Sequence, residues 1–283
     1  MTRPLAVSLV VISALALLFV RAPIAPRHVV PLGGFGHGPT VVLVHGLGSG
    51  AEHWLPVARD LARDHRVVMV ELPGHGVAEM PGTLTLDGAA EGLDRAIEAE
   101  GDQPVVLVGH SVGGLVAMAA AMRQPQRVRA LVLVETALRP QLATVDRDAL
   151  LAALERDYRG TLRECYTAFG RDSVQGAALY AGAARLDPAA MRAWIRFAVT
   201  TDLAGRAASL RVPLLVVLSA RSWPDEESWP SCADSLGYTG AHNVTPVRVE
   251  GVGHFVMLDR PSLVAGLIRR FEQDSGTPAL ALR

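Results

Sequence analysis

The sequence predicts an α/β fold: a doubly wound, mostly parallel sheet with helices on both faces and a helical block inserted between two strands. Short runs rich in valine and leucine alternate with longer amphipathic stretches, which is the order of elements in α/β domains. Most of the short runs are apolar at nearly every position, as in strands that are buried on both faces. One long interval, residues 136–211, contains no such run and interrupts the alternation.

The predicted strands share a near-continuous apolar sequence bounded by turn-forming or polar residues. They are residues 40–45 (TVVLVH), 66–71 (RVVMVE), 104–109 (PVVLVG), 130–135 (ALVLVE), 213–219 (PLLVVLS) and 245–250 (TPVRVE). The amphipathic stretches between and after them predict helices at residues 51–64, 86–100, 113–124 and 261–273.

The interrupting interval predicts several helices and no strand. Asp187 followed by Pro188 is a typical helix start, with an N-cap residue and proline at the first helical position. A helical block between two core strands is expected over the carboxyl edge of the sheet, where open α/β folds bind ligands. We therefore predict a helical lid at about residues 137–210, within a domain that covers residues 28–283. Its helices are expected near residues 146–158, 161–169, 173–185 and 188–200.

Residues 1–27 carry a targeting signal. An uninterrupted apolar run over residues 5–20 is flanked by Arg3 and Arg21, as in a signal peptide or a membrane anchor. The sequence thus predicts an exported or membrane-anchored protein, in the periplasm or cell envelope, that associates with the membrane through residues 5–20. A cytoplasmic location is the alternative.

Composition excludes several classes of partner and chemistry. Half of the 283 residues are apolar and the formal net charge is −1, so the chain can bury a large core but has no field to attract nucleic acid. All 27 basic residues are arginine, which excludes a catalytic lysine. Cys165 and Cys232 are too few for a metal cluster, and two free thiols are favoured over a disulfide. No metal and no cofactor are expected, and the predicted partner is a small-molecule substrate.

The pattern that carries chemistry is GHSVG at residues 109–113. It follows a valine-rich strand and opens an alanine-rich helix, which is the setting of the G-x-S-x-G nucleophile turn. Such a turn exposes the serine hydroxyl above the sheet, and the small residues Gly109 and Gly113 let strand and helix approach each other. The hydroxyl also lies at a helix N-terminus, where developing negative charge is favoured. We predict Ser111 as the nucleophile.

With this motif in place, residues 30–273 resemble the α/β-hydrolase superfamily. HGLGS at residues 45–49 follows an early strand, as in the family's oxyanion loop, and ELPGHG at residues 71–76 is similar to a structural turn of the family. The resemblance implies that the backbone N–H groups of Leu47 and Val112 form the oxyanion hole. Two fixed donors of this kind would stabilise the tetrahedral oxygen of an acyl-transfer reaction.

The family's histidine loop is also present. VEGVGHFVMLDRP at residues 249–261 follows the last predicted strand, and the resemblance implies His254 as the general base. His45 and His110 lie inside the other two motifs, at positions where the side chain orients loops.

The acid of the triad departs from the family pattern. Family members commonly carry it in the loop after the strand that follows the lid, spaced as G-x-x-D. Here Ser219 replaces the glycine and Ser222 stands where the aspartate is expected. A serine cannot stabilise the imidazolium that forms during catalysis, so the acid must come from elsewhere.

Two replacements are consistent with the sequence, and a site without any acid is the third outcome. Some family members carry the acid directly after the strand that precedes the lid, and here that strand ends in Glu135. We favour Glu135, because a carboxylate at the end of an apolar strand needs a partner if it is buried. The alternatives lie in the later loop and are Asp225, Glu226 and Glu227.

These residues predict a serine hydrolase that cleaves a small or medium apolar ester through an acyl-enzyme on Ser111. A serine in this position argues against haloalkane dehalogenases and epoxide hydrolases, whose nucleophile is aspartate. Carbon–carbon bond hydrolases, thioesterases, lactonases and perhydrolases share the serine–histidine pair and stay open. A ligand receptor or signalling protein that keeps the hydrolase fold with little turnover is the alternative from another class.

Overall fold

The computed structural model describes residues 28–276 and contains a seven-stranded sheet in the order β1-β3-β2-β4-β5-β6-β7. All neighbouring strands are parallel except β1, which pairs antiparallel with β3. The predicted doubly wound, mostly parallel fold is confirmed. The strands are β1 Val30–Phe35, β2 Thr40–Val44, β3 Arg66–Glu71, β4 Val105–His110, β5 Val128–Val134, β6 Leu214–Ser219 and β7 Val244–Val249.

Helices cover both faces of the sheet, and each strand contributes alternate side chains to the two cores. Val42 and Val44 of β2 pack with α2 and α3, whereas Val41 and Leu43 pack with α1 and α10. This two-sided burial explains why the strands read as continuous apolar runs. The covering helices are η1 Ala51–Trp54, α1 Leu55–Leu61, α2 Leu86–Glu98, α3 Val112–Arg123, η2 Ala204–Ser209, α8 Trp229–Leu236, α9 Val256–Asp259 and α10 Pro261–Gly276.

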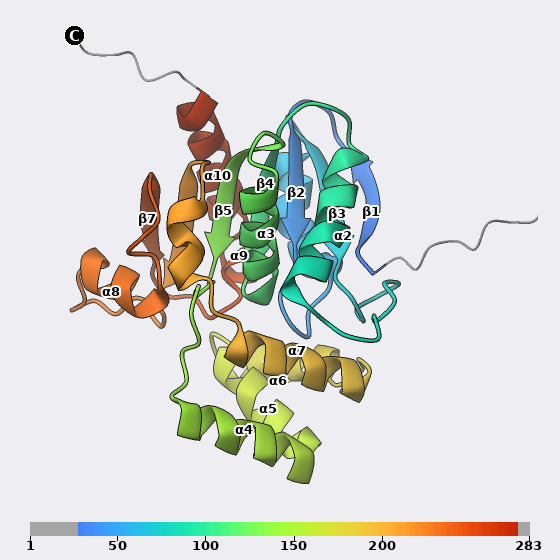
Figure 1. Ribbon diagram of the computed structural model, residues 1–283, viewed down its shortest axis with the longest axis vertical. Helices are drawn as coiled ribbons and strands as arrows, with labels where there is room; N and C mark the ends of the chain where they lie inside the picture. Colours follow the sequence, from blue (N-terminus) through green and yellow to red (C-terminus); the bar gives the residue numbers. More distant parts are fainter. Residues whose placement is uncertain (1–27, 277–283) are drawn as a thin grey trace, which may run out of the picture.

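Four helices are inserted between β5 and β6, as the interval without strands predicted. They form a separate layer beyond the carboxyl ends of the parallel strands (Figure 1). Asp187 caps α7 by accepting a hydrogen bond from the Ala190 N–H at 2.8 Å, and Pro188 opens the helix. We call residues 144–200 the helical insertion. Its helices are α4 Thr144–Arg156, α5 Tyr158–Phe169, α6 Ser173–Ala183 and α7 Pro188–Thr200.

The predicted targeting signal in residues 1–27 lies outside the described residues. Within residues 28–276, no helix is long and apolar enough to cross a membrane. Cys165 and Cys232, which are described, are both free thiols, as favoured from the sequence.

Candidate active site

Ser111 lies in a strained turn between β4 and α3. Its backbone has φ 53°, in the left-handed region that a non-glycine residue rarely adopts. The turn requires glycine on both sides of the serine. A Cβ at Gly109 would meet the backbone of Gly114, and a Cβ at Gly113 would collide with the carbonyl oxygen of His45. These close approaches bring the end of β2 against the turn and raise the serine above the strand ends.

Glu135 and His254 come together from distant parts of the chain. Glu135 directly follows β5, His254 follows β7, and the Glu135 Oε2 atom lies 3.1 Å from the His254 Nδ1 atom. The carboxylate is also hydrogen-bonded by the Ser219 N–H, and at 2.9 Å by the Ser222 hydroxyl. Burial acts to raise the pKa of Glu135, but the hydrogen bond and charge of His254, with the two serine donors, hold that pKa below its usual value.

The acidic cluster considered as an alternative points elsewhere. Asp225 forms an ion pair with Arg248, and Glu227 accepts a hydrogen bond from the Ser231 hydroxyl at 2.9 Å. Glu226 is exposed. Within residues 28–276, Glu135 is thus the only one of the four candidate carboxylates bonded to the histidine.

The backbone of His254 is fixed on both sides. Its N–H donates to the carbonyl of Phe169 at 2.9 Å, and its carbonyl accepts from His110 Nε2 at 2.9 Å. Burial lowers the pKa of His110 well below its usual value, so this imidazole is neutral and donates through Nε2. Ser111 makes no side-chain hydrogen bond to His254 in the described structure. Such bonds are often long without substrate and shorten in the Michaelis complex.

Two backbone N–H groups beside the serine are free to bind an anion. In the described part of the chain, neither the Leu47 N–H nor the Val112 N–H makes a hydrogen bond. Leu47 follows the end of β2, and Val112 begins α3, whose first N–H groups have no partner within the helix. Gly46 packs against the Ser111 side chain, because a Cβ at position 46 would lie 3.1 Å from the Ser111 Cβ. The loop and the nucleophile turn are therefore in contact.

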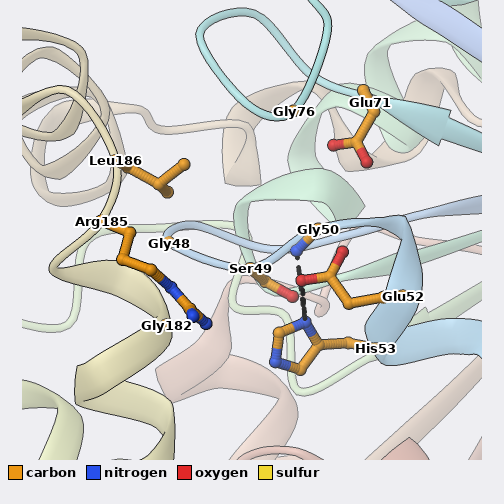
Figure 2. Close-up of a pocket in the computed structure, with 10 residues that line it drawn as sticks. All are labelled: Gly48, Ser49, Gly50, Glu52, His53, Glu71, Gly76, Gly182, Arg185 and Leu186. Carbon is orange, nitrogen blue, oxygen red and sulfur yellow. Dashed lines mark hydrogen bonds and ion pairs between the residues drawn. The ribbon is translucent and has the colours of Figure 1, made fainter.

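A cavity of about 280 Å³ lies next to this loop, between residues 48–50, the end of β3 and the end of α6 (Figure 2). Ser111 and His254 do not line it. Ser49 Oγ and Glu71 Oε2 are buried there without a hydrogen-bond partner among residues 28–276, although Glu71 Oε2 lies 3.1 Å from His45 Nε2. Arg185 reaches into the cavity from the helical insertion (Figure 2). The cavity therefore offers an occupant both apolar contact and the unpartnered polar atoms of Ser49 and Glu71.

The residues described here provide no group of three or more His, Cys, Asp or Glu side chains that could hold a metal ion. The chemistry available at the carboxyl edge of the sheet is that of a serine hydroxyl, an imidazole paired with a carboxylate, and free backbone N–H groups.

Comparison with known proteins gives the family. A model of the alpha/beta hydrolase fold matches residues 39–230. The pimeloyl-[acyl-carrier protein] methyl ester esterase of Xanthomonas campestris pv. campestris is 30% identical over 255 residues, which cover 83% of this chain and 96% of that protein. The chain therefore belongs to the alpha/beta hydrolase fold family.

Two further proteins are similar to this chain. Polyketide synthase ThaQ of Burkholderia thailandensis is 32% identical over 236 residues, 79% of this chain, but the chain spans only 11% of that much longer protein. The solved structure of a hydrolase from Oleispira antarctica superposes with a TM-score of 0.75 at 18% identity, over 88% of this chain and 96% of that one. A likeness at this level of identity shows the fold alone.

Several residues that shape the site gave no signal in the sequence. Ser222, which was noted only because it replaces an aspartate, donates to the carboxylate of Glu135. Tyr166 of α5 donates to the carbonyl of Leu47 at 2.8 Å, and His75 accepts from the Gly48 N–H at 3.2 Å. A tyrosine in a helix has no pattern that could have revealed its contact.

Proposed function

We propose that the chain is a serine hydrolase that cleaves esters through an acyl-enzyme. The observation that carries this proposal is the 3.1 Å contact between Glu135 Oε2 and His254 Nδ1, beside a serine in a strained turn at a helix N-terminus. Glu135 holds the proton of His254 on Nδ1, which leaves the lone pair of Nε2 free to act as a base. The family membership supports a hydrolytic reaction.

In the acylation step, the Ser111 oxygen attacks the ester carbonyl while His254 Nε2 takes the hydroxyl proton. The carbonyl oxygen becomes an oxyanion that accepts hydrogen bonds from the Leu47 and Val112 N–H groups. Collapse of this intermediate breaks the bond to the alcohol, which leaves with the proton from His254. The charge of Glu135 stabilises the imidazolium between these events.

Deacylation repeats the same steps with water. His254 takes a proton from a water molecule as its oxygen attacks the acyl carbonyl, and the same two N–H groups bind the second oxyanion. The bond to Ser111 then breaks, the serine recovers its proton from His254, and the carboxylic acid is released. No metal or cofactor enters this sequence of steps.

For the substrate, we propose a small or medium ester with an apolar part near the nucleophile. The ring of Phe169, from the helical insertion, stacks on His254 with centroids 4.7 Å apart, so one wall of the site is apolar. One relative is named for a methyl ester substrate, which is consistent with an ester as the bond cleaved. Thioesters, lactones and carbon–carbon bonds are rival substrates for the same residues.

Active-site labelling tests the proposal. We expect a fluorophosphonate probe to label the folded protein and the Ser231→Ala variant, whose serine lies outside the site, but not Ser111→Ala. A series of p-nitrophenyl esters of increasing chain length then measures kcat and KM beside matched thioesters and lactones. Labelling that persists in Ser111→Ala would refute Ser111 as the nucleophile. An unlabelled wild-type protein that binds the esters without turnover would refute the proposed hydrolase activity.

A further inference from the structure

The peptide between Leu47 and Gly48 is held on both sides by side chains from elsewhere in the chain. The Tyr166 hydroxyl donates to the Leu47 carbonyl at 2.8 Å, and the Gly48 N–H donates to His75 Nε2 at 3.2 Å. The peptide before it is held as well, because His45 Nδ1 donates to the Gly46 carbonyl at 2.8 Å. In residues 46–48, the Leu47 N–H is thus free while the neighbouring backbone groups on either side are fixed.

The two side chains that hold Gly48 and Leu47 have the protonation states that these bonds require. Burial, with the nearby His45, lowers the pKa of His75 to about 3, so its Nε2 carries a lone pair while Nδ1–H donates to the Pro73 carbonyl at 3.0 Å. Burial raises the pKa of Tyr166 well above its usual value, so the hydroxyl keeps its proton.

Tyr166 belongs to the helical insertion, and its helix also contacts the histidine loop. Phe169, one turn further along α5, lies on the same side of the helix and packs edge-on against Tyr166 at 5.7 Å. The Phe169 ring stacks on His254, and the Phe169 carbonyl accepts from the His254 N–H. A Cβ at Gly253 would collide with the backbone of residues 169–171, so the two segments touch backbone to backbone. The last turn of α5 therefore bridges both loops.

The loop is shaped to receive the tyrosine. Gly48 has φ 64°, which favours glycine, and a Cβ there would collide with the Tyr166 hydroxyl. Tyr166 is 2% exposed, so the ring is packed into the fold and is not a mobile surface contact. The helical insertion also contacts the turn at residues 71–76, because Trp194 Nε1 donates to the Pro73 carbonyl at 2.7 Å.

We propose that Tyr166 is a positioning residue for catalysis: its hydroxyl fixes the peptide next to Leu47 and thereby aims the Leu47 N–H at the oxyanion. The inference rests on the proposed serine hydrolase reaction and extends it to the helical insertion. The insertion is then part of the catalytic framework as well as a cover, since α5 sets the oxyanion donor through Tyr166 and contacts the general base through Phe169. A donor stabilises a transition state only if it is already aligned when charge develops.

The Tyr166→Phe variant tests this role, because it removes one oxygen and keeps the ring. Loss of an oxyanion donor costs roughly 10²–10³ in kcat, and a donor that is present but less well aligned is expected to cost about tenfold. We expect kcat on the best ester to fall about tenfold with KM within about twofold of wild type. The number of active sites titrated by the fluorophosphonate probe should not change.

Tyr158→Phe is the matched control. Tyr158 begins the same helix, and its buried hydroxyl has no hydrogen-bond partner in the described structure. We expect its kcat and KM to equal those of wild type. A trifluoromethyl ketone adds to the serine and carries an oxyanion, so its Ki should rise in Tyr166→Phe by the same factor by which kcat/KM falls.

Three results would overturn the proposal. A Tyr166→Phe variant with wild-type kcat shows that the hydroxyl does not matter. A lower rate explained by fewer titratable sites, with an unchanged Ki for the ketone, shows a role in folding alone. A wild-type protein that is not labelled at Ser111 refutes the proposed hydrolase and, with it, the positioning role.

Discussion

Ser111 and Glu135 both adopt positive φ angles, 53° and 51°, although neither is glycine. Only one other non-glycine residue in the described chain does so, Asn243, and asparagine tolerates this region better than most residues. Each strained residue costs on the order of 1–3 kcal/mol and persists only where its surroundings fix it. Here the neighbouring strands do so, since the Ser111 N–H donates to the Val134 carbonyl and the Glu135 N–H to the Val217 carbonyl, both at 2.9 Å.

Replacement of the acid is the sharpest residue-level prediction. Glu135→Gln keeps the size of the side chain but removes the charge that stabilises the imidazolium. We therefore expect kcat to fall by up to about 10⁴-fold, with KM little changed. Asp225→Asn, whose carboxylate pairs with Arg248, is the control and should be mild. Steady-state kinetics on the same ester ranks the two variants. The opposite ranking would refute the assignment of the acid.

The sequence was sufficient to favour Glu135 over three other carboxylates, but not to exclude those three. A carboxylate at the end of an apolar strand indicates a buried partner, and it says nothing of which partner. Three other carboxylates followed β6, and only the tertiary structure shows that His254 reaches β5 and that Ser222 and Ser219 donate to the same carboxylate. Position 222, where the family pattern has aspartate, is thus occupied by a serine that donates a hydrogen bond to Glu135.

At the level of elements, long apolar strands and amphipathic helices were predictable, whereas β1 and α8 were missed. Strand β1 has the sequence VPLGGF, whose proline and glycines argue against a strand, and it is tolerated because it lies at the sheet edge. Helix α8 begins at Trp229, two residues after Glu227, and the polar and turn-forming residues before it hid its start. Both depend on tertiary contacts more than on local preference.

Helix α10 is attached to the core by a buried histidine. His65 Nδ1 lies 2.7 Å from Asp64 Oδ1, and His65 Nε2 lies 2.6 Å from Glu272 Oε2 on the helix. Glu272 also pairs with Arg129 at 2.9 Å, and Asp64 with Arg269 at 2.8 Å. The hydrogen bond to Glu272 raises the pKa of His65, against burial, which lowers it, and Asp64 adds to the rise. His65 therefore links α10 to the turn before β3.

This link makes stability depend on pH. A histidine whose pKa is raised on folding contributes fully below its unfolded value, about 6.5, and the contribution is lost as pH rises through the folded pKa. We expect His65→Gln to lower the free energy of unfolding by more at about pH 6 than at about pH 9, measured by urea denaturation. The exposed His242→Gln is the control and should show no such difference. An equal loss of unfolding free energy at both pH values would show that a charged His65 does not stabilise the folded protein.

At the level of the whole molecule, the proposed catalytic residues gather where the carboxyl ends of β2, β4, β5 and β7 meet the helical insertion (Figure 1). Parallel strands bring their ends to one edge, which is why loops far apart in sequence could be predicted to meet. The contacts from side chains to backbone groups across that edge, such as that of Tyr166 with the Leu47 carbonyl, could not be predicted because they leave no periodic pattern.

The apolar run at residues 5–20 leads us to propose an exported or membrane-anchored location for the whole protein. We expect the full chain to be recovered in the membrane or exported fraction of expressing cells, and a variant that begins at His28 in the soluble cell extract. Immunoblots of the fractions, with ester hydrolysis measured in each, make the comparison. Equal distribution of the two forms would refute a targeting role for residues 1–27.

The contact between Tyr166 and Gly48 has a consequence for any exchange of the helical insertion. A side chain at position 48 and a tyrosine at position 166 exclude each other, because they would occupy the same space. A helical insertion grafted from a relative to change the substrate range would therefore alter turnover too, unless residue 48 and the loop around residue 253 were exchanged with it. In this chain, the helical insertion and the two short core loops on which it rests therefore form one structural unit.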